Sequence, residues 1–429
     1  MAAPDDLPPT GAARVGRADV EAAADLLRGV IDPSPVEQSR WLARLVGGPV
    51  LFKCENLQRA GSFKVRGAYT RMSRLSERQR ALGVVTASAG NHAQGVALAA
   101  SLLGIRATVF MPAGAALPKE QATRGYGAEV VIGGASIDEC LLAAAAFSDE
   151  TGATLIHPFD HADIVAGQGT VGLEILQQCP QVRTVVVPIG GGGLAAGLAA
   201  VLHGGAPAGG SGRDRRVRLV GVQAAGAAAY PGSIAAGHPV ALQRANTMAD
   251  GIAVGRPGDV PFGMLTDDAD GLDALRTVSE ESLSRAVLQT LERGKLVVEP
   301  AGAAGVAAVL DDPAAFEPPV VVVLSGGNID PLLLARVIRH GLAASRRYLA
   351  ITVRFPDRPG SLADLLSRVA DSGANVLEVV HRRTPADLAV DDVEVSLDLE
   401  TRGEDHCAQV VAALRSSGYS VLRDDRTSG

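Results

Sequence analysis

The sequence is poor in aromatic residues and in cysteine, and both shortages restrict what the protein can be. Aromatic residues make up only 3% of the 429 residues, so the core must be built from Ala, Val, Leu and Ile. The cysteines are far apart and form no CxxC pair: Cys54, Cys140, Cys179 and Cys407. This spacing predicts neither a structural zinc site nor a disulfide framework.

Long apolar runs and an excess of positive charge are also missing. No stretch approaches the roughly 18 consecutive apolar residues of a membrane-spanning helix. The first residues lack the apolar segment of a secretory signal, so we expect the protein to act in the cytoplasm. The net charge of −7 argues against nucleic-acid binding. We therefore expect small-molecule partners, with neither a membrane nor a nucleic acid among them.

Lysine is unusually scarce, because only four of the 40 basic residues Lys and Arg are lysines. These are Lys53, Lys64, Lys119 and Lys295. A lysine kept in an arginine-rich background suggests a need for an amine that can lose its proton, which arginine cannot do. The settings of the other three favour structural or solvated roles, whereas Lys64 opens a helical stretch directly after a Gly-Ser turn.

The first three quarters of the chain alternate between short apolar β-branched runs and alanine-rich helical stretches. Runs such as Thr184–Ile189 and Pro319–Leu324 are apolar on both faces, as in strands of a parallel sheet covered by helices. Stretches such as Asn91–Leu103 have the composition of helices. This alternation predicts an α/β fold with a mainly parallel sheet over residues 1–345.

The pattern changes after residue 347. We expect, in order, a strand, a helix, two strands, a helix and a strand at residues 348–355, 361–372, 375–383, 392–400, 404–417 and 419–422. This βαββαβ order predicts a ferredoxin-like domain over residues 346–429.

The first motif that carries chemistry is Gly61–Ala68, GSFKVRGA, which contains Lys64. Burial and the positive end of a helix dipole would lower the pKa of Lys64 and favour the neutral amine that forms a Schiff base. A lone lysine of this kind is more often a surface residue of an amphipathic helix. Three further motifs favour the chemical interpretation.

Each of these three motifs follows an apolar strand. Thr86–Gly95, TASAGNHAQG, opens a helix whose free N–H groups suit a carboxylate, although Asn91 alone could be a simple cap. The glycines at 190–193 form a backbone nest for a phosphate. A dinucleotide site is disfavoured because Gln223, not an acidic residue, ends the next strand. Ser325 lies where open α/β sheets bind ligands, although alone it could be a turn residue.

Together GSFKVRGA, TASAGNHAQG, GGGGL and SGGN resemble the motifs of fold-type-II pyridoxal 5'-phosphate (PLP) enzymes. These are tryptophan synthase β-like proteins with two open, mainly parallel sheets. Within them the chain is most similar to the threonine ammonia-lyases (threonine dehydratases), over about three hundred residues. The resemblance includes segments 51–58, 157–170, 249–255 and 297–303.

The C-terminal segment resembles an ACT domain, a small-molecule sensor of amino-acid enzymes, through its loop Asp357-Arg358-Pro359-Gly360. The two resemblances together imply a PLP-dependent catalytic domain at 1–345, with a smaller subdomain at about 76–160, and a regulatory domain at 346–429. A domain used only for dimerisation is the alternative for the second. A homo-oligomer, either a tetramer or a dimer, is also implied.

The resemblance assigns roles to individual residues. Lys64 would be the catalytic residue and would hold PLP as a Schiff base. The implied cofactor-binding residues are Phe63, Lys64, Asn91, Gly190, Gly191, Gly192, Gly193, Leu194, Gly251, Glu299 and Ser325. The implied residues around the substrate carboxylate are Ser88, Gly90, Asn91 and His92. The implied contacts of an amino-acid effector are Asp357, Gly360 and Asn375.

Two departures from related enzymes narrow the reaction. Serine racemases of the superfamily have a second serine where this chain has Ala89, so racemisation is disfavoured. They also bind a divalent cation through an acidic residue after the strand that ends here at Gln223. The ten residues that follow Gln223, AAGAAAYPGS, contain no carboxylate, so no metal site is expected.

The implied reaction is the dehydration and deamination of L-threonine to 2-oxobutanoate and ammonium, with L-serine, which gives pyruvate, as a poorer substrate. Regulation would act through the ACT domain. A serine or 3-hydroxyaspartate dehydratase, a β-replacing synthase and a non-catalytic amino-acid sensor are the alternatives. A role in isoleucine biosynthesis or in threonine breakdown stays open.

Overall fold

The computed structural model describes residues 14–203, 216–344, 346–383 and 391–423. The chain forms two compact units, Met1–Pro331 and Leu332–Gly429. The division lies at the start of helix α14 (Pro331–Ala344), which the sequence analysis assigned to the larger domain. No helix in the described ranges is long and apolar enough to cross a membrane.

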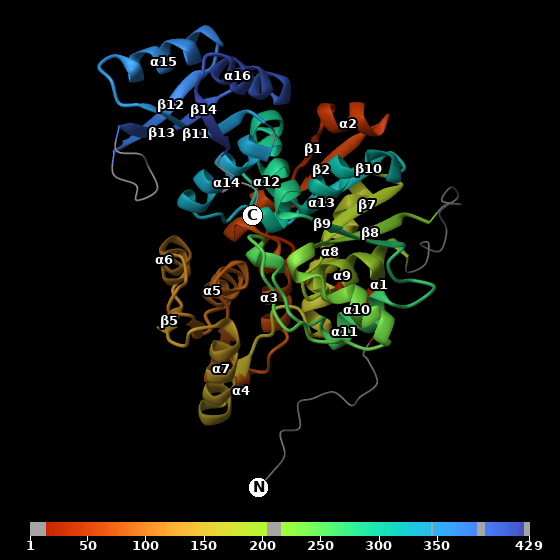
Figure 1. Cartoon of the computed structure of the whole chain (residues 1–429). Coiled ribbons are helices and arrows are strands. Elements are labelled where there is room, and N and C mark those ends of the chain that lie inside the picture. The colour runs from red at the N-terminus through yellow and green to blue at the C-terminus, as the bar shows by residue number, and fades with distance from the viewer. Residues whose placement is uncertain (1–13, 204–215, 345, 384–390, 424–429) are drawn as a thin grey trace. The chain divides into compact units, whose positions relative to one another are not determined.

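The N-terminal unit contains two sheets, and the larger belongs to what we call the large lobe (Figure 1). Its six strands lie in the order β1 (Val36–Gln38), β2 (Val50–Cys54), β10 (Val320–Leu324), β7 (Thr184–Pro188), β8 (Arg218–Ala224) and β9 (Ala274–Val278). All neighbours are parallel except β1 and β2. Every residue of β7 and β10 is buried, which confirms the expectation of strands covered on both faces.

Helices pack on both faces of this sheet. Helix α13 (Pro300–Asp311) contacts β7, β8 and β10, and α12 (Glu280–Gln289) packs on α13. Helix α9 (Gly193–Leu202) contacts β7 and β8, and packs against α8 (Ala162–Gln178) and α11 (Asp259–Leu265). Helix α1 (Arg17–Leu27) lies on α8, and the short helices α2 (Arg40–Val46) and α10 (Ala229–Ala236) complete the lobe.

The small lobe is built on a four-stranded parallel sheet in the order β5 (Glu129–Ile132), β4 (Ala107–Met111), β3 (Val84–Ala87) and β6 (Thr154–Leu155). Around it pack α4 (Glu77–Leu82), α5 (Asn91–Leu103), α6 (Leu117–Gly125) and α7 (Ile137–Thr151). Helix α3 (Lys64–Ser73) contacts both α5 and α8, so it joins the two lobes.

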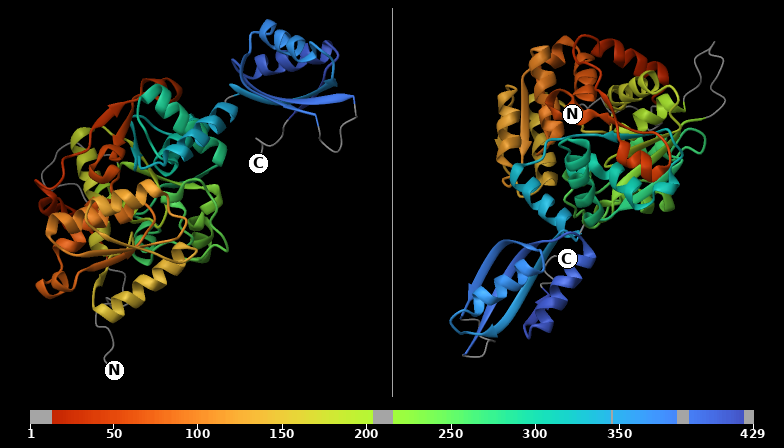
Figure 2. Two further views of the ribbon diagram at one scale, coloured as in Figure 1. Left: turned by 90° about the vertical axis from the view of Figure 1, so that its left-hand side faces the viewer. Right: turned by 90° about the horizontal axis from the view of Figure 1, so that it is seen from above.

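The C-terminal unit has its own hydrophobic core and its own sheet. After α14 its elements are β11 (Tyr348–Pro356), α15 (Ser361–Asp371), β12 (Asn375–Arg382), β13 (Asp392–Glu400), α16 (Glu404–Ser416) and β14 (Ser420–Arg423). The antiparallel sheet has the order β12-β13-β11-β14, and Figure 2 shows both helices on one face of it. The expected βαββαβ order is confirmed.

Candidate active site

The motifs found in the sequence meet because parallel strands present their carboxyl ends along one edge of a sheet. Strand β10 lies between β2 and β7, so the segments that follow these three strands are neighbours. The backbone N–H of Phe63 donates to the carbonyl of Ser325 at 3.2 Å, and the N–H of Gly327 donates to the carbonyl of Gly61 at 2.9 Å. The Lys64 loop is therefore tied to the end of β10.

Lys64 is the first residue of helix α3, as expected from its Gly-Ser turn. Its Nζ donates to the carbonyl of Pro158 at 3.0 Å and lies 5.1 Å from the centre of the Phe63 ring. Burial lowers the pKa of the Lys64 amine to about 8, although the nearby Glu299 carboxylate opposes this shift. A substantial fraction of the amine is therefore neutral near physiological pH, the form that a nucleophilic lysine requires.

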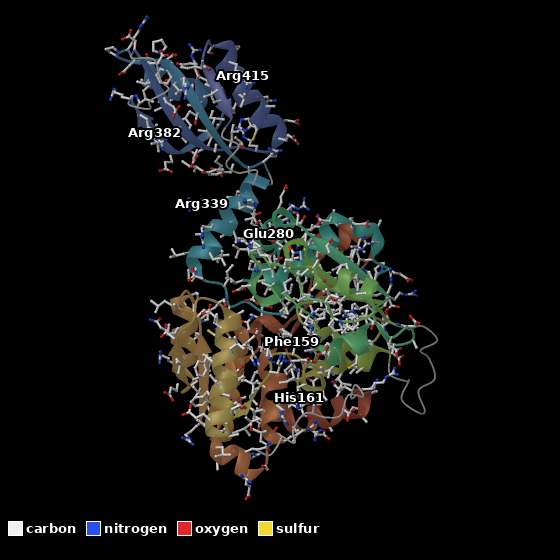
Figure 3. The ribbon with its side chains drawn as sticks, turned by 60° about the horizontal axis from the view of Figure 1, so that its bottom comes forward. Phe159, His161, Glu280, Arg339, Arg382 and Arg415 are labelled. Atoms are coloured by element: carbon white, nitrogen blue, oxygen red, sulfur yellow. The ribbon has the colours of Figure 1, made fainter. Side chains whose placement is uncertain are left out.

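The four glycines after β7 form a loop whose shape depends on the absence of side chains. Gly192 has a φ of +101°, a conformation that L side chains rarely adopt. A Cβ atom on Gly191 would lie 2.3 Å from the ring of Phe159, which comes from the segment that joins the lobes (Figure 3). Helix α9 begins at Gly193, so its first N–H groups have no intrahelical partners. Bare backbone at a helix N-terminus fits a phosphate group.

Asn91 and Glu299 form a buried pair beside this loop. Asn91 Nδ2 donates to Glu299 Oε1 at 2.6 Å, and Asn328 Nδ2 donates to Asn91 Oδ1 at 2.9 Å. Glu299 Oε2 is buried and has no hydrogen-bond partner within the described chain. Burial, and then the charge of Asp250, raise the pKa of Glu299 to about 7. Gly251 lies close by, because a Cβ there would be 3.3 Å from Glu299 Oε1.

The turn after β3 has the open helix start that suits a carboxylate. Ser88 Oγ accepts a hydrogen bond from the N–H of Gly90 at 3.2 Å, and helix α5 begins at Asn91. The ring of His92 has a different partner, since its Nε2 lies 2.9 Å from the carbonyl oxygen of Ile156. Burial lowers the pKa of His92 to about 3, so the ring is neutral. The Nε2 atom of His92 is therefore already engaged, while the backbone N–H of His92 lies in the first turn of α5.

The sequence suggested only a structural or solvated role for Lys119 and no role for Phe159. Lys119 forms an ion pair with Asp250, and its Nζ lies 3.8 Å from the position of a Cβ atom on Gly90. Phe159 lies within segment 157–170, which resembles the threonine ammonia-lyases, but no sequence signal linked it to Gly191. The only signal that could have singled out Lys119 is the scarcity of lysine in the chain.

Gln223 has structural hydrogen bonds at the end of β8. Its Nε2 lies 3.4 Å from the carbonyl of Ile189, and its Oε1 accepts from the N–H of Tyr230 at 3.0 Å. No group of three His, Cys, Asp or Glu side chains that could hold a metal ion occurs among the residues that the structure describes.

In the C-terminal unit the three expected effector contacts do not share one pocket. Gly360, with a φ of +92°, precedes α15 and lines a pocket of about 410 Å³. The other lining residues are Phe355, Pro356, Arg358, Pro359, Ser361, Asp364, Ser417, Gly418 and Tyr419. Asp357 instead accepts a hydrogen bond from Arg383 at 2.8 Å, and Asn375 donates to Glu400 at 3.3 Å.

The family model for pyridoxal-phosphate dependent enzymes matches residues 27–326. This range contains the Lys64 loop, the glycine loop and the Asn91–Glu299 pair. The chain therefore belongs to the PLP-dependent enzyme family, and PLP is its cofactor.

Individual relatives show which PLP-dependent enzymes the chain is similar to. Over 403 residues the chain is 42% identical to the L-threonine ammonia-lyase of Thermotoga maritima, which covers 94% of this chain and 98% of the relative. The solved T.th. threonine deaminase is 38% identical with a TM-score of 0.67, covering 73% of this chain and 99% of that one. Maize serine racemase is 34% identical with a TM-score of 0.69, covering 75% and 98%.

Proposed function

We propose that the chain is a threonine ammonia-lyase, which converts L-threonine to 2-oxobutanoate and ammonium and acts more slowly on L-serine. The observation that carries this proposal is the position of Lys64. Lys64 opens α3, which packs on α5. Its half-buried amine has a pKa of about 8 and donates to the carbonyl of Pro158, the residue before the Phe159 ring that lies against Gly191. The names of the relatives support threonine as the main substrate.

The residues that would hold PLP lie around Lys64. The backbone N–H groups of Gly190 to Leu194 would bind the phosphate, and Asn91 would bind the ring hydroxyl. Ser325 would face the ring nitrogen, while Phe63 would pack beside the ring. When bound, PLP withdraws electrons from the substrate Cα, which makes its proton acidic and allows the β-hydroxyl to leave.

The chain itself would bind the substrate and move one proton. The N–H groups at the start of α5, together with Ser88 Oγ, would hold the carboxylate and so orient the Cα–H bond toward Lys64. The neutral Nζ of Lys64 would accept that proton. Loss of water and later addition of water release ammonium and leave the 2-oxo acid. Because Ala89 has no hydroxyl that could return a proton to Cα, we do not propose racemisation.

The C-terminal unit would be a regulatory domain of the ACT type, and the pocket beside Gly360 would bind an amino-acid effector. Because Asp357 and Asn375 already have side-chain partners, Gly360 is the best supported of the three expected contacts with an effector. If the enzyme serves isoleucine biosynthesis, 2-oxobutanoate is the product that it supplies to that pathway. The cytoplasmic location, the domain division and the tetramer or dimer stay predictions.

The test is release of 2-oxo acid from L-threonine and from L-serine by the PLP-loaded protein. We expect faster turnover of threonine, and no turnover by Lys64→Ala, with circular dichroism to show that the variant is folded. No 2-oxo acid from either substrate, with PLP bound, would contradict the proposal and favour other β-hydroxy amino acids or a β-replacement reaction. Higher rates with serine or 3-hydroxyaspartate would identify the alternative dehydratases.

A further inference from the structure

The ion pair between Lys119 and Asp250 crosses from one lobe to the other within the N-terminal unit. Lys119 lies in the first turn of α6, in the small lobe, and Asp250 begins a single 3-10 turn at Asp250–Ile252 that packs against α13 of the large lobe. Asp250 is itself held, because its Oδ1 accepts the N–H of Gly251 at 2.8 Å. The position of the Lys119 ammonium is therefore set from both lobes.

The Lys119 ammonium is nearly buried and has unused hydrogen-bonding capacity. Its side chain is 10% exposed, against 52% for that of Asp250. An ammonium group has three donors, yet within the described residues Asp250 is the one partner of Nζ. Buried N–H donors of a charged group are costly when they have no acceptor. The two donors of Lys119 that Asp250 does not use therefore indicate that a ligand binds beside Lys119.

The Lys119 ammonium lies close to the turn after β3. The Nζ atom is 3.8 Å from the position of a Cβ on Gly90, the residue before helix α5. The helix N-terminus adds partial positive charge at the same place. An anion bound to the first N–H groups of α5 would therefore lie within reach of Lys119, and the two groups would attract it together.

We infer that Lys119 is a further substrate-binding residue, whose ammonium pairs with the α-carboxylate of the amino-acid substrate while Asp250 holds it in position. This inference rests on the proposed function, which makes an amino acid the substrate. It replaces the structural or solvated role that the sequence suggested for Lys119. It also explains why a lysine stands here in an arginine-rich chain, since a compact ammonium fits between two carboxylates better than a planar guanidinium.

The test compares two small amine ligands that differ in whether they carry a carboxylate, so that a loss of carboxylate binding can be told apart from a general loss of binding. L-2-aminobutyrate keeps the amine and carboxylate of threonine but has no β-hydroxyl to lose, and 1-aminopropane lacks the carboxylate as well. Their dissociation constants are measured from the visible absorbance of the PLP-loaded full chain, for the wild type, Lys119→Met and Lys119→Gln. Lys295→Met, which removes an exposed lysine outside the site, is the matched control for charge.

Loss of one charge-assisted contact should weaken binding of L-2-aminobutyrate about tenfold or more in both Lys119 variants. The dissociation constant of 1-aminopropane should change less than about twofold in the Lys119 variants. In Lys295→Met the dissociation constants of both amines should equal those of the wild type. With L-threonine the KM should rise by a similar factor while kcat changes little, and Lys119→Arg should restore part of the loss.

Equal weakening of both amines would show a structural role for Lys119 and overturn the inference, and so would unchanged binding of L-2-aminobutyrate. Lys119→Gln keeps a polar side chain, so the test remains available if Lys119→Met does not fold. A wild type that makes no 2-oxo acid while Lys119→Gln selectively loses the carboxylate ligand would overturn the proposed function but not this inference.

Discussion

Lys64 depends on its surroundings for its chemistry. An ordinary lysine has a pKa of 10.5, and burial at the start of α3 lowers the pKa of Lys64 to about 8. The Glu299 carboxylate would favour the charged amine, but burial has the larger effect. The protein thus contains an amine that is ready to react without a neighbouring side chain to remove its proton.

The rate at which the apoprotein binds PLP should therefore depend on pH in a specific way. Only the neutral amine attacks the aldehyde of PLP, so the rate should rise with pH and level off above about 8. Stopped-flow absorbance after mixing with PLP measures this rate, with Lys64→Ala as the control for PLP that binds without reacting. A rate that still rises steeply near pH 10 would mean that the amine has an ordinary pKa.

Glu299 should also affect pH dependence, through its own charge. Burial and Asp250 raise its pKa to about 7, so its carboxyl group loses a proton as the pH passes through that value. In Glu299→Gln the amide oxygen can still accept the hydrogen bond from Asn91, but no charge appears. We expect the variant to bind PLP while its activity changes less between about pH 6 and pH 8 than that of the wild type. An unchanged profile would assign the titration to another group.

At the level of elements, the glycine loop is shaped by a residue far away in the sequence. In Gly191→Ala the new methyl group would meet the Phe159 ring at 2.3 Å, and the aromatic ring packed there cannot give way cheaply. Overpacking of this kind should weaken PLP binding about tenfold or more. Gly232→Ala, in helix α10, is the matched control, because nothing lies within 4 Å of its Cβ position. Recovery of binding in Gly191→Ala combined with Phe159→Ala would identify the ring as the cause.

A buried ion network fixes helix α3 to its neighbours. Lys53 Nζ pairs with Glu174 at 2.5 Å, while Arg66 bonds to Glu174 at 2.6 Å and to Glu55 at 2.8 Å. The side chains of Lys53, Arg66 and Glu55 are almost completely buried. Burial by itself would raise the pKa of Glu55, but the Arg66 guanidinium prevails and lowers it, so Glu55 is charged. The network thus connects β2, α3 and α8 through charged groups.

Removing one member should leave an uncompensated buried charge. We expect Lys53→Met to destabilise the protein by about 3 kcal/mol. Urea unfolding followed by circular dichroism measures the change, and Lys295→Met should fall within about 0.5 kcal/mol of the wild type because that lysine is exposed. Equal stability of the two variants would show that the network contributes little.

At the scale of the whole molecule, the two units have separate cores. Regulation would require that binding in one unit change the activity of the other, which is a coupling of free energies between two sites. The pocket beside Gly360 is the place in the C-terminal unit where we propose that such a ligand binds.

Gly360→Val should remove the response to an effector and keep the basal activity. Valine is strained at a φ of +92° and should move the loop that lines the pocket. Gly403→Val is a matched control, since Gly403 also has a positive φ, of +129°, but does not line the pocket. The KM for threonine is measured with and without each of a panel of amino acids. The same response in both variants would place the effector elsewhere.

Features encoded in neighbouring residues could be predicted from the sequence. The alternation of apolar runs and helices predicts the α/β unit, and the βαββαβ order predicts the second unit, because periodicity and turn residues act locally. Helix α5 and strand β13 have the predicted bounds, and α3 begins at Lys64. The motifs that surround Lys64 could be predicted to meet because parallel strands end at a common edge.

Other features depend on which side chains packing brings together across the chain. Strands β1 and β6 are short, and both of them and β9 are only partly buried, so their pairing comes from neighbouring strands and not from their own sequence. The ring of His92 bonds to Ile156, and Lys119 meets Asp250 across 131 residues. The orientation of a side chain follows from the contacts it finds in the folded protein. The sequence therefore specifies the elements and the chemical groups of the site, while tertiary packing determines which groups face a ligand and which are used to hold the fold together.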